Sequence, residues 1–213
     1  MEFKPDFATA YNNRANAYKS KGELKRAMDD YNNAIDLRPD FAEAYYNRGN
    51  AYNDKGEFDC AIKDYGKAID LKPDHAQAYN SRGNIHRARG NYDDAIRDYN
   101  RAIGLKLDYA NAYYHRGNAY AKKGNFSRAI KDYSKAVQLN PNLADAYHNR
   151  GTAYQITGDI DCAIKNFNKA IGLKSDYAEA YHNRGSAYYV KRDFDNAIKD
   201  YNKAIELSST LYI

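Results

Sequence analysis

The sequence has few cysteines and no long apolar segment. Its 213 residues contain only Cys60 and Cys162, too few for a disulfide scaffold, and two isolated thiols are typical of a reducing compartment. No uninterrupted apolar run approaches the ~18 residues that a membrane-spanning helix needs. The first residues also lack the apolar core of a signal peptide. We therefore expect a cytoplasmic protein with no membrane span.

Residues with the spacing of catalytic or metal-binding motifs are missing as well. The five histidines form no ligand-spaced pair within one predicted helix, and the two cysteines lie far apart. No glycine-rich phosphate loop follows a strand, because the pattern predicts no strand. The sequence therefore predicts no catalytic residue, no metal site and no cofactor, and we do not expect an enzyme.

A strong excess of one charge is also absent. Lysine and arginine total 33 residues against 28 acidic residues, a formal net charge of +5, which indicates no polyanionic partner. The mean hydropathy of -0.93 and the 29% of charged residues would by themselves favour disorder. The regular spacing of the same residues indicates instead an ordered chain.

What the sequence does contain is an uninterrupted 34-residue repeat. One column of acidic or amide residues recurs at this period, at Asp6, Asp40, Asp74, Asp108, Asn142 and Asp176. No residue is inserted or deleted between them. We therefore predict a single array within residues 1–213, made of six units at 6–39, 40–73, 74–107, 108–141, 142–175 and 176–209.

Each unit has the pattern of two amphipathic helices. In the second unit, apolar or small residues recur at helical spacing over 40–56 and again over 57–73. A glycine column predicts the left-handed residue that ends each first helix, at Gly22, Gly56, Gly90, Gly124 and Gly158. The pairs Asp40 with Glu43 and Asp176 with Glu179 match a capping box at the start of a first helix.

Some turns depart from these columns. Arg192 stands where the other units have glycine. Pro39, Pro73 and Pro141 end second helices, and the other units have Leu107, Ser175 and Ser209 in that column. We expect looser or differently shaped turns at the departing positions, within an unchanged fold.

Small and aromatic columns predict how the helices pack. Gly49 and its equivalents, with Ala15 in the first unit, are predicted to face the alanine column of Ala27, Ala61, Ala95, Ala129, Ala163 and Ala197. Two tyrosine columns, one containing Tyr45 and the other Tyr52, are predicted to fill the wider spaces of the core.

This pattern resembles the tetratricopeptide repeat family, which has an aromatic residue, Leu-Gly and Tyr in the first helix and Ala, an aromatic residue, Ala and a final Pro in the second. The matching residues of the second unit are Tyr45, Gly49, Tyr52, Ala61, Tyr65, Ala68 and Pro73. The resemblance covers all six units, and it implies an all-α α-solenoid, a right-handed superhelix of six antiparallel helix-turn-helix repeats with about twelve helices. It also implies a concave groove lined mainly by first helices. The longer period of pentatricopeptide RNA readers does not match.

One departure from the family is systematic. Arginine replaces the family's leucine at Arg14, Arg48, Arg82, Arg116, Arg150 and Arg184. The second helices carry a matching column of Asp30, Asp64, Asp98, Asp132, Asn166 and Asp200. Because an unpaired guanidinium against the core would be costly, we predict one structural ion pair in each hairpin that has both partners. The alternative is an arginine ladder that binds acidic ligands.

The resemblance places a track of amide and aromatic side chains in the groove. Its predicted members are Asn12, Asn13, Asn16, Tyr46, Asn47, Asn50, Asn80, Asn84, Tyr114, Asn118, His148, Asn149, Thr152, His182, Asn183 and Ser186. An amide both donates and accepts, so it can pair with any peptide backbone. The track is similar to the asparagine ladder of tetratricopeptide domains that hold extended peptides, as in the O-linked glucosamine transferase family. The alternative is that asparagine is simply a common surface residue here.

The subgroup that binds chaperone tails has a different groove. Its clamp for two carboxylates needs Lys and Arg at positions that here hold Asn12, Asn47, Gln77 and Ser81. We therefore do not expect this chain to bind the C-termini of heat-shock chaperones.

Basic pairs four residues apart mark the outer face of the second helices, for example Lys63 with Lys67 and Lys131 with Lys135. Acidic residues such as Asp59 and Asp161 precede a basic residue by four, which predicts salt bridges along each helix. We therefore interpret the stripe as a solvated surface, and nucleic acid is not an expected partner.

The last unit shows no recognisable C-terminal capping helix. Apolar residues there are predicted to be exposed and to mediate self-association: Ile198, Ile205, Leu207, Leu211, Tyr212 and Ile213. Three hypotheses follow. The first is a protein-interaction scaffold that binds an extended peptide in the groove, the second is a scaffold that assembles with its own copies, and the third is an anionic-surface binder that uses the basic stripe.

Overall fold

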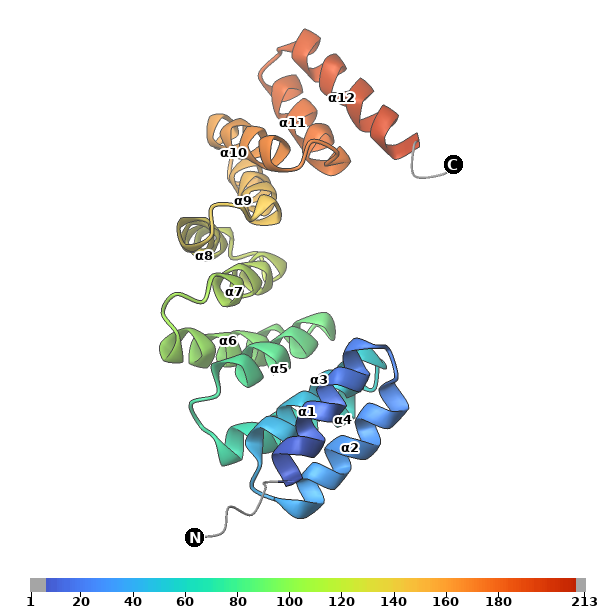
Figure 1. The fold of residues 1–213 in the computed structure, drawn as a ribbon. Helices are drawn as coiled ribbons and strands as arrows, with labels where there is room; N and C mark the ends of the chain where they lie inside the picture. Colours follow the sequence, from blue (N-terminus) through green and yellow to red (C-terminus); the bar gives the residue numbers. More distant parts are fainter. Residues whose placement is uncertain (1–6, 210–213) are drawn as a thin grey trace. The chain divides into compact units, whose positions relative to one another are not determined.

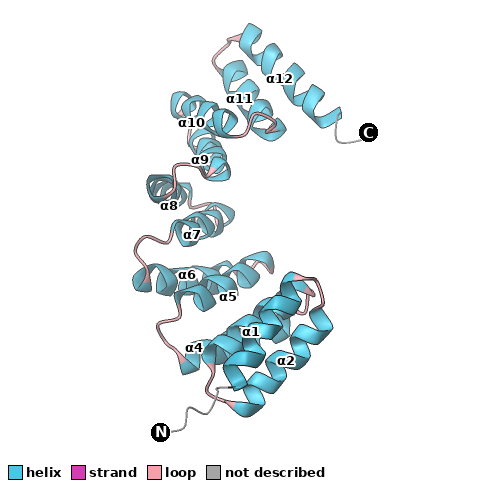
Figure 2. Cartoon of the chain, in the orientation of Figure 1, coloured by secondary structure: helices cyan, strands magenta, loops and turns pink. Residues whose placement is uncertain are grey.

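The computed structural model describes residues 7–209, in which helices are joined by short turns (Figures 1 and 2). This part of the chain contains twelve α-helices and no strand, which confirms the all-α prediction. The helices are α1 (Phe7–Ser20), α2 (Leu24–Leu37), α3 (Ala42–Asp54), α4 (Phe58–Leu71), α5 (Ala76–Ala88), α6 (Tyr92–Leu105), α7 (Ala110–Lys122), α8 (Phe126–Leu139), α9 (Ala144–Ile156), α10 (Ile160–Leu173), α11 (Ala178–Val190) and α12 (Phe194–Ser209).

Consecutive helices pair into hairpins, and the hairpins form two units. Unit 1 is Met1–Leu107 with α1 to α6, and unit 2 is Asp108–Ile213 with α7 to α12. Within unit 1, α3 packs against α4 of its own hairpin and against α2 of the preceding one. In unit 2, α9 packs in the same way against α10 and α8. This packing of successive hairpins is that of an α-solenoid.

The glycine column ends the first helices in the predicted way. Gly22, Gly56, Gly90, Gly124 and Gly158 all have a positive φ, between 74° and 88°. The turn at Arg192 is not looser, and that expectation is wrong. Arg192 adopts a φ of 62°, and Asp193 donates its backbone N–H to Tyr188 over 3.0 Å, as Glu57 does to Tyr52 over 2.9 Å. The closing hydrogen bonds of the turn therefore hold a non-glycine residue in a left-handed conformation.

The turns without proline keep the shape of those with it. Lys106 before Leu107 has φ -139° and ψ 94°, close to the -136° and 85° of Lys72 before Pro73. Lys174 before Ser175 has -138° and 95°. The expectation of altered turns is therefore wrong here too, because an extended residue ends the helix whether or not proline follows. The turn after Ser209 lies outside the described residues.

The predicted capping boxes do not form. The residue at the N-cap of α3 is Phe41 rather than Asp40, and that of α11 is Tyr177 rather than Asp176, and neither start has a side-chain cap. Phe41 packs against Ala34, Ile35 and Ala44, so apolar packing positions the entry to the helix. Side-chain caps occur instead on second helices, for example at Asn125.

The glycine column of the first helices meets aromatic rings most closely. It also meets the alanine column as predicted at two hairpins, where Ala15 shares a buried cluster with Ala27 and a Cβ added at Gly185 would lie 3.3 Å from the backbone oxygen of Ala197. A Cβ added at Gly49 would lie 2.8 Å from a ring carbon of Tyr65, and one added at Gly117 would lie 2.7 Å from Tyr133. The fully buried large side chains are the rings that meet this column: Tyr31, Tyr65, Tyr99, Tyr133 and Phe167. Tyr45 and Tyr52, predicted as core, are only half-buried.

Candidate functional site

The arginine and aspartate columns pair within each hairpin that has both residues. In the second hairpin, Arg48 Nε lies 2.7 Å from one carboxylate oxygen of Asp64, and its Nη2 donates to the other over 2.8 Å. The same two-point contact joins Arg14 to Asp30, Arg82 to Asp98, Arg116 to Asp132 and Arg184 to Asp200. The hydrogen bond to Asp64 raises the pKa of Arg48. A paired, half-buried guanidinium contributes to the hairpin rather than standing open to an acidic ligand.

The fifth hairpin keeps the arginine without a carboxylate. Arg150 Nε donates to Asn166 Oδ1 over 2.7 Å, and its Nη1 donates to Ser134 Oγ over 3.0 Å. Burial lowers the pKa of Arg150. This hairpin therefore holds a half-buried cation on neutral partners.

The two half-buried tyrosine columns flank these guanidiniums. The Cζ atom of Arg48 lies 5.5 Å from the ring centre of Tyr45 and 5.9 Å from that of Tyr52. Arg184 lies 5.4 Å and 5.9 Å from Tyr181 and Tyr188. The tyrosines therefore complete a cation–π sandwich around the ion pair.

One asparagine of each early hairpin accepts a hydrogen bond from a buried tyrosine. The hydroxyl of Tyr65 donates to Asn50 Oδ1 over 2.8 Å. Equivalent bonds join Tyr31 to Asn16, Tyr99 to Asn84 and Tyr133 to Asn118. Burial raises the pKa of Tyr31 to about 12 and that of Tyr99 to about 12, so these hydroxyls keep their protons. The bond fixes each amide with its oxygen turned toward the core.

A second asparagine column connects neighbouring first helices. Asn47 Nδ2 donates to Asn12 Oδ1 over 3.0 Å, and Asn149 Nδ2 donates to Asn118 Oδ1 over 2.9 Å. Asn183 Nδ2 lies 2.8 Å from His148 Nε2. These amides join one hairpin to the next, a role that the sequence did not reveal.

The other predicted groove residues differ in exposure. Asn12 and Asn80 are buried, at 3% and 7% exposed, so neither presents an open side chain. Asn13 is exposed on α1. Tyr46 is half-buried with its ring centre 4.7 Å from that of His75, and Tyr114 lies 6.2 Å from Tyr133.

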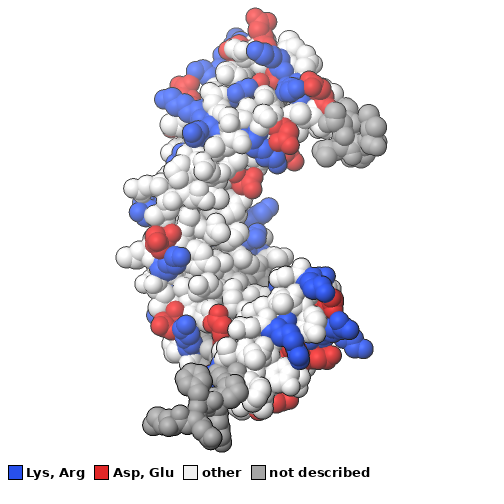
Figure 3. Space-filling model, viewed as in Figure 1, with Lys and Arg blue, Asp and Glu red and all other residues white. Residues whose placement is uncertain are grey.

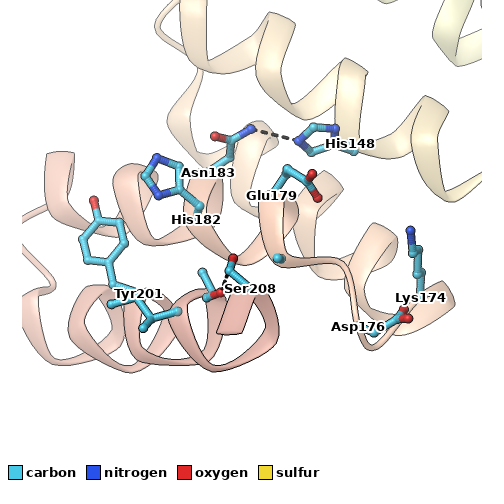
Figure 4. Close-up of a pocket in the computed structure, with 11 residues that line it drawn as sticks. His148, Lys174, Asp176, Glu179, His182, Asn183, Tyr201 and Ser208 are labelled. Atoms are coloured by element: carbon cyan, nitrogen blue, oxygen red, sulfur yellow. Dashed lines mark hydrogen bonds between the residues drawn. The ribbon is translucent and has the colours of Figure 1, made fainter. Parts of the chain in front are cut away.

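A pocket of about 960 Å³ opens in unit 2 (Figure 4). It brings together three predicted residues, His148, His182 and Asn183, and Figure 4 shows Asn183 pointing toward His148. Burial lowers the pKa of His148, which favours a neutral ring. The other walls of the pocket were not predicted to line a groove, although Ile205 is a predicted self-association residue: Lys174, Asp176, Ala178, Glu179, Tyr201, Ala204, Ile205 and Ser208. The capping contact predicted for Glu179 does not form, and the residue lines this pocket instead.

Exposed apolar side chains gather in the last hairpin. Ile198 and Ile205 are 58% and 64% exposed, and Leu207 is half-buried. The other predicted self-association residues, Leu211, Tyr212 and Ile213, lie outside the described residues.

The charged surface is mixed. On the face that Figure 3 shows, basic and acidic side chains are interspersed. The predicted salt bridges within one helix are wrong for two residues, because Asp59 pairs with Arg89 at 2.6 Å and Asp161 with Lys191 at 2.5 Å. Both contacts reach the next hairpin. The end of its first helix lies closer to the aspartate than the basic residue one turn along the aspartate's own helix.

Metal-ligand clusters and membrane-spanning helices are both absent from the described part of the chain. Over residues 7–209, His, Cys, Asp and Glu side chains do not gather in threes at metal-binding distance. No helix within the same range is long and apolar enough to cross a membrane.

Family models match nearly the whole array. The model described as "TPR repeat" matches residues 15–53, 49–87, 83–124, 117–158 and 156–191. The model described as "Tetratricopeptide repeat" matches residues 178–211. The chain belongs to the tetratricopeptide repeat family. No curated protein matches the sequence.

Solved tetratricopeptide structures resemble the chain. MamA is 32% identical over 77% of this chain and 96% of its own, with a TM-score of 0.73. YrrB, described as a TPR protein with an unusual peptide-binding site, is 25% identical over 83% of this chain and 91% of its own, with a TM-score of 0.73. PilF of Pseudomonas aeruginosa has a TM-score of 0.81 over 96% of both chains at 16% identity, which shows the shared fold alone.

Proposed function

We propose that this tetratricopeptide protein is an interaction scaffold that binds an extended peptide along the amide-bearing face of its first helices. Membership of the family and the likeness to a relative with a peptide-binding site support an interaction scaffold.

The observation that carries the proposal is the orientation of the amide track of unit 1, which consists of Asn16, Asn50 and Asn84. Each oxygen accepts a tyrosine hydroxyl from its own hairpin, at 2.6, 2.8 and 2.8 Å. Within the described part of unit 1, Nδ2 of Asn50 and Asn84 donates to no other atom. The track therefore presents N–H donors at the same place in successive hairpins.

A row of fixed donors suits a ligand that supplies acceptors at regular intervals. The carbonyl groups of an extended peptide do so whatever its side chains are. Because the buried tyrosines hold the amides in place before binding, little side-chain entropy is lost when the peptide arrives. Recognition by this track is directed at the backbone.

The pocket of unit 2 is by itself a second place at which a side chain of a peptide can bind. Its walls combine an exposed imidazole at His182, the carboxylate of Glu179 and the aromatic ring of Tyr201. A lining of polar and apolar side chains together is typical of sites that select one side chain of a peptide.

The test uses substitutions that remove the donors and keep the acceptors. Asn50→Asp and Asn84→Asp retain an oxygen for Tyr65 and Tyr99 but lose the outward N–H. Peptides selected with the wild-type chain from a random-sequence display library should bind the double variant at least about tenfold more weakly, a loss of ~1.4 kcal/mol or more.

A control is Asn33→Asp, which adds the charge of one of the two substitutions at an exposed position of α2. It should bind the selected peptides as the wild-type chain does. Equal binding by the double variant would contradict the proposal, provided that its circular dichroism and urea midpoint match those of the control.

A further inference from the structure

Within each unit, one repeated apolar interface joins a hairpin to the next. In unit 1, Phe41 and Tyr45 of α3 pack against Ala34 and Ile35 of α2. The interface of α9 with α8 in unit 2 uses the equivalent residues Leu143, Tyr147, Ala136 and Val137. At both interfaces, a first helix therefore covers the same face of the hairpin before it.

The interface also has a repeated polar contact. Arg48 Nη1 donates to Asn32 Oδ1 of the preceding hairpin over 2.8 Å. In unit 2, Arg184 Nη1 donates to Asn168 Oδ1 over 2.6 Å. The arginine that forms the internal ion pair therefore uses its remaining nitrogen to bind the neighbouring hairpin.

The outer face of α12 has the acceptor half of this interface. Tyr201 is partly exposed, whereas its equivalents in the other five hairpins are under 2% exposed. Ile198 is 58% exposed, whereas its equivalent Ile62 packs against the core cluster of Ala61 and Tyr65. Asn202, the equivalent of Asn32 and Asn168, is exposed beside them.

The outer face of α1 has the complementary half. Phe7, the equivalent of Phe41, is 62% exposed. The side chain of Arg14 is 57% exposed, against 18% for Arg48. A cavity of about 210 Å³ is lined on this face by Phe7, Ala10, Tyr11 and Arg14. These are the residue types with which α3 covers α2.

We propose that the outer face of α12 binds α1 of a second copy of this chain, in the geometry that joins neighbouring hairpins within a unit. Phe7 and Tyr11 of the second copy pack against Ala204 and Ile205, the equivalents of Ala34 and Ile35, and Arg14 Nη1 donates to Asn202. The two faces match because each carries the residue types found on one side of the interface between α2 and α3. The contact is head-to-tail, so it leaves a free face at each end and allows further copies to add.

The experiment measures self-association of the full chain by sedimentation velocity over a range of concentrations. The wild-type protein should show a mass that rises with concentration. Ile198→Asp, which places a charge on the α12 face, and Phe7→Asp, which places one on the α1 face, should each weaken association at least about tenfold. Ile156→Asp is the matched control, because Ile156 is 57% exposed and lies in neither terminal hairpin.

Mixing the two end variants gives the sharpest result. Each variant keeps one intact face, so Phe7→Asp with Ile198→Asp should form a complex of two chains although each alone stays monomeric. Dimerisation of either variant alone would overturn the proposal, because it would show a symmetric contact. A wild-type chain that stays monomeric at every concentration would also overturn it, and would show that another segment covers the α12 face. The α12 face shares Ala204 and Ile205 with the pocket of unit 2, so a second copy would compete there with a peptide side chain. Peptide binding to the amide track of unit 1 is measured separately on the monomeric variants, so the two proposals can fail independently.

Discussion

The fourth hairpin, α7–α8, and the fifth, α9–α10, have the same close packing. A Cβ added at Gly117 would lie 2.7 Å from a ring carbon of Tyr133, and one added at Gly151 would lie 2.7 Å from Phe167. The approach of the two helices is therefore independent of whether the ring carries a hydroxyl.

Their polar residues differ together at three positions. The ion pair of Arg116 with Asp132 becomes Arg150 with Asn166 in the fifth hairpin. The hydroxyl that binds Asn118 is lost with Phe167, and Thr152 replaces the asparagine, donating to the backbone of its own helix. The contact of glycine with a ring is therefore common to both hairpins, whereas the polar pairs around it differ.

The largest expected effect comes from disturbing the contact between glycine and an aromatic ring, which both hairpins share. Gly117→Ala and Gly151→Ala should each lower the free energy of unfolding by about 1–3 kcal/mol, because the new methyl group meets a fully buried ring. Urea denaturation followed by circular dichroism measures the change. Gly172→Ala on α10 is the control, since nothing lies within 4 Å of its added Cβ. A neutral Gly117→Ala would contradict the packing account.

Exchanging the residue opposite the arginine should change the free energy of unfolding in opposite directions for the two hairpins. Asn166→Asp gives Arg150 a carboxylate and should raise the free energy of unfolding by about 1–2 kcal/mol. Asp132→Asn should lower it by a similar amount. Loss of stability on Asn166→Asp would show that Arg150 gains nothing from a charged partner.

Removing one hydroxyl should have a smaller effect. Tyr133→Phe breaks the bond to Asn118 and should cost about 1 kcal/mol. Phe167→Tyr alone buries a hydroxyl opposite threonine and should destabilise the chain, and adding Thr152→Asn should recover most of the loss. A double-mutant cycle over these two positions measures the coupling, and zero coupling would contradict the paired exchange.

A still smaller effect on stability is expected at the turn of the last hairpin, where Arg192 stands in place of glycine. Arg192→Gly should raise the free energy of unfolding by about 0.5–1 kcal/mol, because glycine adopts the positive φ of 62° without strain. Gly158→Arg should lower it by about 1 kcal/mol at the equivalent turn. Thermal unfolding of the two variants beside the wild-type chain tests the opposite signs.

The pH dependence of unit 2 should be slight and should depend on His148. Burial lowers its pKa in the folded chain, so below its ordinary pKa of about 6.5 the unfolded chain binds the proton more readily. The contribution of neutral, buried His148 to the stability of the folded chain is therefore fully present at pH 7.5. It is lost as the pH falls below about 6.5. Unfolding of the wild-type chain and of His148→Gln at pH 7.5 and 5.5 should differ less at the lower pH.

Regular columns made most of the fold predictable from the sequence. The hairpins, the glycine turns and the partners of Arg48, Arg82 and Arg116 follow from one period, because equivalent residues meet equivalent neighbours. The turn at Arg192 did not follow, because turn propensity was overridden by the hydrogen bonds that close the turn and by hairpin packing.

The internal partners of the amide track could not be foreseen from spacing on one helix. Asn50 and Tyr65 lie on facing helices, and only the closeness of Gly49 to the ring brings the hydroxyl to the amide. A signal was present, because Phe167 and Thr152 depart from the tyrosine and asparagine columns in the same unit. The same bond turns each oxygen inward, so the track offers donors rather than complete amides.

Recognition of the peptide backbone by the amide track is tested by the affinity of one selected peptide. The affinity is measured for the wild-type chain, for the double variant Asn50→Asp with Asn84→Asp, and for Asn33→Asp. Isothermal titration should show at least about tenfold weaker binding for the double variant alone. Replacing single peptide bonds by esters, which accept hydrogen bonds less well, should weaken binding to the wild-type chain. Unchanged affinity of the double variant, with its fold intact, would contradict recognition of the peptide backbone by the amide track.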